Sequence, residues 1–211
     1  MPGLIHGLEA DVIRSNLQRV RERAGEKVEI LAATKYVPPE EMGALAEAGV
    51  SLVGENRLQD LEAKQERWGG EFTWDFIGNL QSRKVKDLLP RVRLIHSVAS
   101  DSALRQLGRH ADPDTEVLVE VNVAGEESKG GIDPGELGAF IDRCPVRVSG
   151  LMTMPPFSED PEASRPYFAR LAELASEHGL ERLSMGSSQD WEVAVEERAT
   201  ILRLGTTLYA R

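Results

Sequence analysis

Short apolar segments recur eight times along the chain, and helical spacing follows most of them. The apolar segments are residues 27–34, 51–54, 74–78, 93–98, 116–124, 146–154, 182–186 and 201–205. Strands that alternate with helices form parallel sheets with helical crossovers, so the pattern predicts an α/β protein. Eight strands is the number that closes a TIM-type (β/α)8 barrel, which is the fold we predict.

An open, doubly wound sheet is the competing arrangement. Such a sheet usually has fewer strands, and its dinucleotide-binding form carries a G-x-G-x-x-G turn that is absent after every expected strand. The helical stretches include 38–49, with Pro and Glu in its first turn, and 166–179, which ends in glycine. No change of composition marks a second domain, and we therefore predict a single barrel domain over 1–211.

Residues 1–25 form a segment of their own before the first expected strand. Its apolar residues recur at spacings of three and four, which predicts an amphipathic helix that stops at Gly25. The last expected strand lies close to Arg211, so we expect no helix after it and no C-terminal β-domain. The N-terminal helix is expected to pack on the barrel and fill that gap in its wall. Its apolar residues are Ile5, Leu8, Val12, Ile13, Leu17 and Val20.

Charge and cysteine content exclude several classes of protein. The 211 residues include 25 Lys and Arg against 35 Asp and Glu, a net charge of −10 that disfavours binding to nucleic acid or to an anionic membrane. A single cysteine, Cys144, excludes an internal disulfide and a thiolate metal cluster, and no metal site is expected. No segment has the pattern of a signal peptide or a membrane span, so we expect a cytoplasmic protein.

The ends of the last two expected strands carry small and hydroxylated residues. Residues 186–188 read Gly-Ser-Ser and residues 205–207 read Gly-Thr-Thr. Small residues let backbone N–H groups approach an anion, and hydroxyls add further donors. Either loop alone is explained equally well as a turn. Their joint placement after the seventh and eighth strands, where such barrels often hold a phosphate, predicts a phosphate site.

Two cationic residues also lie at strand ends. Arg203 alternates with Leu202 and Leu204, so it points into the barrel if the leucines pack on helices. A buried guanidinium needs an acceptor, either a barrel carboxylate or a ligand. Lys35 ends the first strand and becomes nucleophilic in a desolvated pocket, although a solvated lysine is the plainer interpretation. His96, at the end of the fourth strand, is expected to be a satisfied core residue.

Several motifs follow one another in a characteristic order from Leu31 to Tyr209. They are LAATKYVPPEEM, LVGENRLQD, WDFIGNLQSRK, IHSVAS, VNVAGEESKGG, GLMTM, LSMGSSQDWEVAV and ILRLGTTLY. This ordered set resembles the pyridoxal phosphate homeostasis protein family (the YggS/PROSC group), relatives of the alanine racemase barrel domain. The likeness covers nearly the whole barrel.

The resemblance implies pyridoxal 5′-phosphate (PLP) bound as a Schiff base (an aldimine) on Lys35. It further implies that Arg203 faces the pyridine nitrogen, that Asn56 lies beside the cofactor and that Lys129 assists cofactor exchange. The residues implied to hold the phosphate are Ser188, Gly205 and Thr206. The chain departs from the family at Asp75, where histidine is usual, and at Arg83, where asparagine is common. We expect both departures to alter the mouth near the third strand without touching the cofactor contacts.

The same residues bear on whether the protein is an enzyme. PLP stabilises a carbanion best when its ring nitrogen is protonated, and a cationic Arg203 disfavours that protonation. Racemases of this fold add a C-terminal β-domain and a tyrosine base from a partner subunit. We expect no such domain here, and Tyr36, Tyr167 and Tyr209 have no obvious route to a substrate. We therefore predict a non-catalytic, monomeric protein that buffers PLP, delivers it to PLP-dependent apo-enzymes, and so maintains vitamin B6, amino-acid and keto-acid homeostasis.

Other functions remain open at this point. A small PLP-dependent racemase or lyase would use Lys35 as its base. A phosphosugar aldolase would use the same lysine for a Schiff base with its substrate, and the two loops would hold the sugar phosphate. A purely structural partner-binding role leaves the clustered strand-end residues unexplained.

Overall fold

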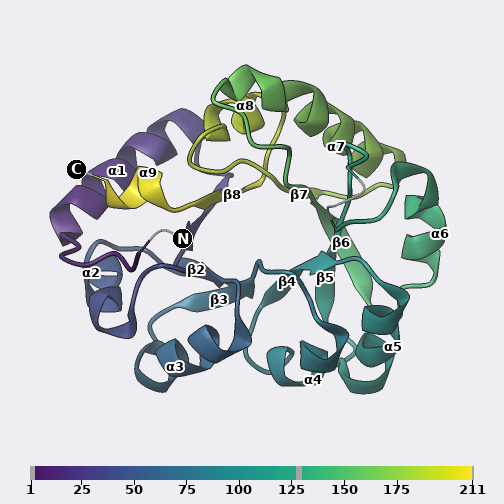
Figure 1. Ribbon diagram of the computed structural model, residues 1–211, viewed down its shortest axis with the longest axis horizontal. Coiled ribbons are helices and arrows are strands. Elements are labelled where there is room, and N and C mark those ends of the chain that lie inside the picture. Colours follow the sequence, from purple (N-terminus) through teal and green to yellow (C-terminus); the bar gives the residue numbers. More distant parts are fainter. Residues whose placement is uncertain (1–2, 127–129, 211) are drawn as a thin grey trace.

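The computed structural model describes residues 3–126 and 130–210, and within these ranges eight parallel strands close into a barrel (Figure 1). Each strand pairs with the next in the chain, and β8 pairs with β1 to close the ring. This confirms the predicted (β/α)8 barrel. The strands are β1 Glu29–Ala33, β2 Leu52–Glu55, β3 Thr73–Phe76, β4 Leu94–Val98, β5 Glu116–Glu120, β6 Arg147–Met152, β7 Arg182–Ser184 and β8 Ile201–Leu204.

Helices surround the barrel (Figure 1). The predicted helical stretch 38–49 begins with a 3-10 turn, Pro39–Glu41, and continues as α2. Across the described residues, no helix is long and apolar enough to cross a membrane. The helices are α1 Ala10–Ala24, α2 Met42–Glu47, α3 Leu58–Trp68, α4 Val85–Leu88, α5 Asp101–His110, α6 Leu137–Asp142, α7 Arg165–Glu177, α8 Trp191–Glu196 and α9 Thr206–Tyr209.

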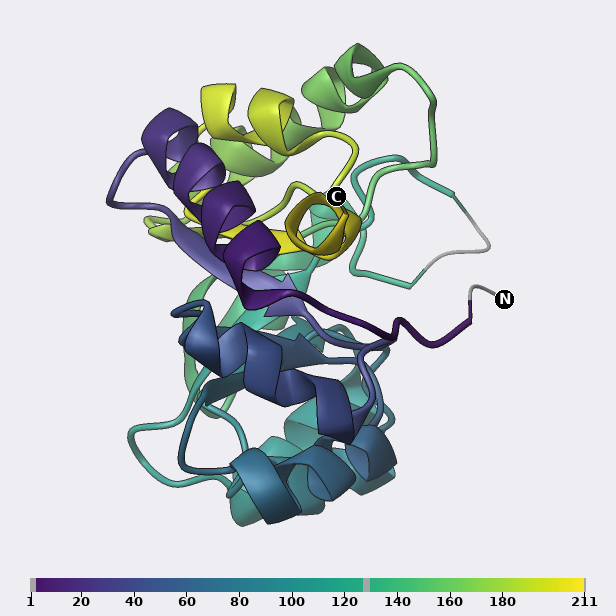
Figure 2. The same cartoon turned by 90° about the vertical axis from the view of Figure 1, so that its left-hand side faces the viewer.

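The first and last helices lie side by side on the barrel wall (Figures 1 and 2). The side chain of Asn16 on α1 donates hydrogen bonds to the carbonyls of Leu208 at 3.2 Å and Ala210 at 2.9 Å. The expectation that no helix follows the last strand was therefore wrong, because α9 turns back from β8 immediately. α1 also packs against α2 and α8, and so covers this part of the wall.

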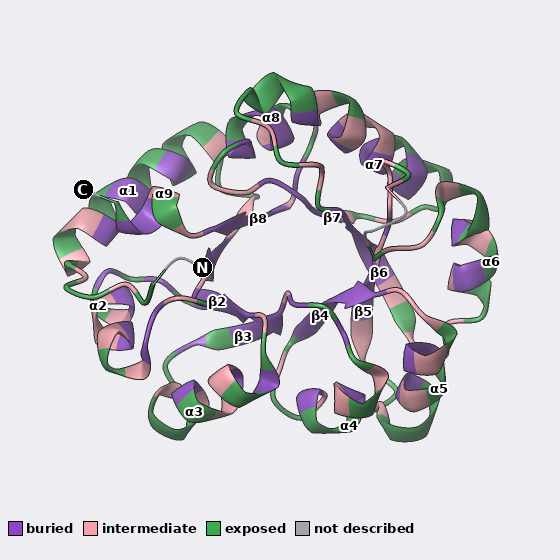
Figure 3. Cartoon of the chain, viewed as in Figure 1, coloured by how far each residue is buried: buried purple, intermediate pink, exposed green. Residues whose placement is uncertain are grey.

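Apolar side chains form two layers, one between strands and helices and one inside the barrel. Figure 3 shows buried residues along the strands and on parts of the surrounding helices. In β8, Leu202 and Leu204 belong to the outer layer and Ile201 to the inner one. The alternation along β8 therefore directs Arg203 into the barrel, as the sequence predicts. The inner apolar layer consists of Leu31, Leu52, Leu94, Leu118, Met152 and Ile201, with Ile77 packed against it.

Candidate functional site

Lys35 and Asn56 follow neighbouring strands and line the same cavity. Lys35 lies just after β1, is exposed, and has its Nζ 5.1 Å from the centre of the Tyr36 ring. Asn56 follows β2 directly. The cavity has a volume of about 390 Å³ and opens beside the first turn of α3. The structure thus brings together a primary amine and an amide that the sequence places 21 residues apart.

A buried cluster fixes the backbone that carries these two residues. Thr34 Oγ1 donates to Glu55 Oε1 at 2.6 Å, and Lys64 Nζ donates to the Thr34 carbonyl at 2.7 Å while it forms an ion pair with Glu55. The backbone N–H of Asn56 donates to Glu55 Oε2 at 3.2 Å. Sequence reasoning missed Lys64. The available signal was its position three residues after Leu61, which continues the buried face of α3.

The loops that follow β7 and β8 are joined through Ser188. Its hydroxyl accepts hydrogen bonds from the backbone N–H groups of Gly205 and Thr207, both at 3.1 Å, and the Thr207 hydroxyl donates to the Ser188 carbonyl at 3.1 Å. Because the Ser188 oxygen accepts from two N–H groups, its own proton remains as a donor. Thr206 begins α9 beside this junction and is exposed. Thr207 belongs to the Gly-Thr-Thr loop of the predicted phosphate site, but it was not among the residues that the resemblance implies for the phosphate.

Arg203 lies inside the barrel and is 7% exposed. Its Nη1 donates to Ser184 Oγ at 2.6 Å, and its Nη2 donates to the Thr153 carbonyl at 2.9 Å and contacts Met154 Sδ at 3.0 Å. These partners are all neutral, and among the described residues no carboxylate forms an ion pair with Arg203. Burial lowers its pKa to about 10, so the guanidinium stays charged at neutral pH.

The two departures from the family pattern lie in different places. Asp75 was expected at the mouth, and this was wrong: it alternates with Trp74 and Phe76 of the outer layer, so it points into the barrel and is completely buried. It accepts hydrogen bonds there from Arg93 and His96. Arg83 is exposed, and it shares the lining of a cavity of about 280 Å³ with Asn56.

Glu120, which the sequence did not single out, and Lys129 complete the description of the site. Glu120, at the end of β5, lines a further cavity of about 370 Å³ that Met154 also lines, and burial raises its pKa although Arg203 opposes the shift. Lys129 lies outside the described residues. Within those residues, no group of His, Cys, Asp and Glu is arranged to hold a metal ion.

His96 should make stability depend on pH. Burial lowers the pKa of its imidazole below the ordinary value of 6.5, and this outweighs the opposite influence of Asp75. The unfolded chain therefore takes up a proton first as pH falls through 6.5, while the folded chain stays neutral. We expect the free energy of unfolding to fall between about pH 7 and pH 5, by at most about 1.4 kcal/mol per pH unit.

Denaturant unfolding at several pH values measures this slope. The variant His96→Gln lacks the titrating group and should show a flatter profile, while the other histidines are common to both proteins. Equal slopes in the two proteins would assign the pH dependence to other groups.

Gly78, two residues after β3, packs against the backbone of Asn56. A Cβ added at Gly78 would lie 2.1 Å from the Asn56 carbonyl oxygen. The backbone would have to move to remove this overlap. We expect Gly78→Ala to lower the free energy of unfolding by about 1–3 kcal/mol, as overpacking does elsewhere. The control is Gly70→Ala, because nothing lies within 4 Å of a Cβ there. An effect no larger than that of the control would show that the Asn56 loop is free to shift.

Comparison with known proteins identifies the family of this chain. A family model described as "Alanine racemase, N-terminal domain" matches residues 8–211. The pyridoxal phosphate homeostasis protein of Aquifex aeolicus (strain VF5) is 42% identical, and the match covers 93% of this chain and 94% of that protein. The chain belongs to the pyridoxal phosphate homeostasis protein family. The member from Pseudomonas aeruginosa is 33% identical over 93% of this chain and 91% of its own.

Solved structures agree with this membership. PipY of Synechococcus elongatus PCC7942, a protein solved both without PLP and with PLP bound, matches in its PLP-free form with a TM-score of 0.83 and 31% identity. That match covers 94% of this chain and 100% of PipY. Alanine racemase from Corynebacterium glutamicum shares the fold alone, with a TM-score of 0.76 and 17% identity, and the match covers 99% of this chain but 63% of the racemase.

Proposed function

We propose that this member of the family binds PLP, holds it at the mouth of the barrel and releases it to other proteins. The names of the relatives and the PLP-bound form of PipY support the choice of ligand. The donor set supports it independently. It contains an amine that can link to an aldehyde, the Ser188 hydroxyl whose proton remains as a donor for a phosphate, and a charged guanidinium that forms no ion pair within the described residues.

Each residue has a distinct part in this proposal. Lys35 would supply the amine that attaches to the cofactor's aldehyde, with Asn56 beside it in the same cavity. Arg203 would donate to the pyridine nitrogen, and Lys129 would assist exchange. The phosphate would be held by Ser188, Gly205 and Thr206.

The state of Arg203 is the observation that favours binding over catalysis. Bound PLP supplies an electron sink for carbanion chemistry, and the sink is strongest when the ring nitrogen is protonated. A buried guanidinium that stays charged at neutral pH disfavours that proton. Tyr209 offers no base in compensation: burial raises its pKa, and its hydroxyl donates to the Ala33 carbonyl at 3.2 Å.

The exposure of Lys35 favours a protein that gives up its cofactor. An amine at an exposed cavity is accessible to water and to competing amines, so the covalent link can exchange with the surroundings. We therefore propose a monomeric, cytoplasmic carrier that passes PLP to apo-enzymes and contributes to vitamin B6, amino-acid and keto-acid homeostasis.

Three measurements on the purified protein test this function: cofactor binding, cofactor transfer and turnover. Incubation with PLP, equilibrium dialysis and a spectrum establish whether the cofactor binds, and transfer is followed by adding a PLP-dependent apo-enzyme and recording the activity that it regains. Racemase, transaminase and lyase assays of the loaded protein should show no substantial turnover. Absence of binding would overturn the proposal altogether, and substantial turnover would replace the carrier with an enzyme.

A further inference from the structure

A continuous chain of hydrogen bonds runs through the barrel interior and ends on Arg203. Arg203 Nη1 contacts Ser184 Oγ at 2.6 Å, and Ser184 Oγ contacts His96 Nδ1 at 2.9 Å. His96 Nε2 contacts Asp75 Oδ2 at 3.1 Å. Ser184, His96 and Asp75 are 0% exposed, so bulk water does not reach these groups. We call Asp75, His96 and Ser184 the relay.

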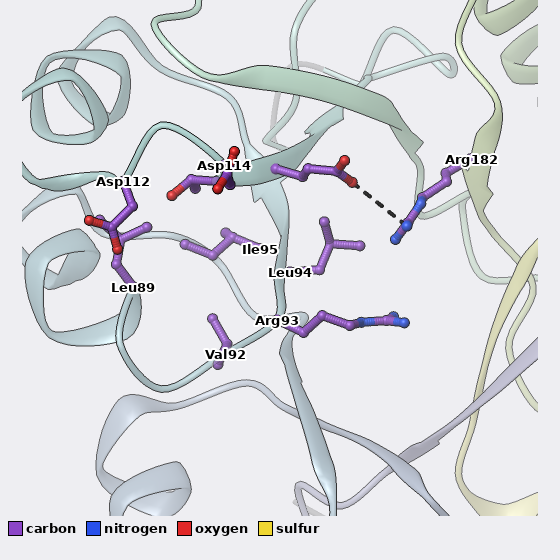
Figure 4. A pocket seen from close by; sticks show the side chains of 10 residues that line it. Leu89, Val92, Arg93, Leu94, Ile95, Asp112, Asp114 and Arg182 are labelled. Carbon is purple, nitrogen blue, oxygen red and sulfur yellow. Dashed lines mark ion pairs between the residues drawn. The ribbon is translucent and has the colours of Figure 1, made fainter.

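The far end of the relay is anchored by Arg93. Its Nε donates to Asp75 Oδ1 at 3.0 Å and its Nη2 to Asp75 Oδ2 at 2.7 Å, while Nη1 donates to Glu29 at 2.5 Å. Arg93 directly precedes β4 and lines a cavity of about 370 Å³ with Arg182 and Asp114 (Figure 4). The relay therefore links the amino-terminal end of the strands to the interior position of Arg203.

The protons in the relay have a single consistent arrangement. Burial raises the pKa of Asp75, but hydrogen bonds from His96 and Arg93 outweigh burial and hold it below its ordinary value, so the carboxylate only accepts. His96 must then carry its proton on Nε2. Burial keeps the imidazole neutral, so Nδ1 is an acceptor and takes the hydroxyl proton of Ser184. The lone pairs of Ser184 consequently face Arg203 and accept its Nη1 proton.

We propose that Asp75, His96 and Ser184 are positioning residues that orient Arg203 for the pyridine nitrogen of PLP. Asp75 selects the tautomer of His96, His96 directs the hydroxyl of Ser184, and Ser184 with the Thr153 carbonyl fixes two nitrogens of the guanidinium. A hydroxyl with the opposite orientation would present its proton to a cation. The proposal rests on the proposed function, because it concerns how Arg203 meets the cofactor.

The test compares two ligands, PLP and its 1-deaza analogue, in which a C–H group replaces the ring nitrogen. Wild-type protein should bind PLP about tenfold or more tightly than the analogue, as measured by apparent Kd, because only PLP can accept a hydrogen bond from the charged guanidinium. In Ser184→Ala the guanidinium loses an acceptor, and the preference should fall to about twofold or threefold. If Ser184 contributes only to packing, Ser184→Ala should weaken the binding of both ligands equally and leave the preference for PLP unchanged.

Ser149→Ala is the matched control. Ser149 lies on the neighbouring strand β6, is 6% exposed, and in the described part of the chain its hydroxyl has no hydrogen-bond partner. The Ser149→Ala variant should keep the wild-type preference for PLP over its 1-deaza analogue. A preference that is unchanged in Ser184→Ala, or lost equally in Ser149→Ala, would overturn the positioning role. Wild-type protein that binds neither ligand would overturn the proposed function and this proposal with it.

A second measurement needs neither a variant nor the cofactor. The ¹⁵N chemical shifts of the His96 ring in the PLP-free wild-type protein report which nitrogen carries the proton. A neutral ring protonated on Nε2 at neutral pH supports the relay, whether or not PLP binds. A proton on Nδ1, or on both nitrogens, would overturn it.

Discussion

Replacing Lys35 with alanine should abolish covalent attachment of PLP. The side chain supplies the proposed attachment amine, and the other lysine that lines the cavity, Lys64, is buried in its ion pair with Glu55. After incubation with PLP and reduction with borohydride, peptide mass mapping should find the phosphopyridoxyl group on Lys35 in the wild-type protein. The variant should carry no adduct in the cavity and should lose the visible absorption of the loaded protein.

Two comparisons make this result specific. Lys86→Ala removes another exposed lysine, from α4, and should label like the wild type. Because Lys35 is exposed, its replacement should change the free energy of unfolding by no more than about 0.5 kcal/mol. An adduct that persists in Lys35→Ala, or that maps to another lysine in the wild-type protein, would show that the attachment site is elsewhere.

Replacing Lys64 with methionine should lower the free energy of unfolding by about 3–5 kcal/mol. Glu55 and Lys64 are both almost completely buried, with side-chain exposures of 0% and 4%. Methionine fills a similar volume but leaves the Glu55 carboxylate without its counter-ion and the Thr34 carbonyl without its donor. Denaturant unfolding measures the loss.

A double variant separates charge from packing. Adding Glu55→Gln to Lys64→Met removes the unpaired charge and should recover a large part of the lost stability, whereas Glu55→Gln alone should be destabilising. A single variant Lys64→Met as stable as the wild type would mean that Glu55 takes up a proton at little cost. If the double variant is no better than the single one, packing rather than charge explains the loss.

The barrel was predictable because its signals are local. Each observed strand begins within two residues of a predicted apolar segment, and the alternation of Arg203 with two leucines indicated its inward direction. The placement of Lys35 and Asn56 after neighbouring strands followed from the barrel topology in the same way. The roles assigned to these residues come from the resemblance and stay predictions.

The polar interior was not predictable because its partners are distant in sequence. Ser184 and His96 are separated by 88 residues, and no local pattern relates them. Asp75 was assigned to the mouth because its neighbours follow a strand-end motif, yet its charge is balanced by Arg93, 18 residues away and at the other end of the barrel. The helix α9 was missed because four residues are too few to show a helical period.

The contact between α1 and α9 has a consequence for synthesis on the ribosome. Asn16 reaches a carbonyl 192 residues further along the chain, so α1 receives this partner only after all eight strands have been synthesised. Until then, its buried face of Ile13, Leu17 and Val20 lacks α8 and α9 as neighbours. Closing so long a loop costs conformational entropy, so this contact forms late. Until it forms, the exposed apolar face is a target for chaperones. The nascent chain should therefore acquire resistance to proteolysis abruptly, after β8 and α9 have left the exit tunnel, rather than one strand at a time.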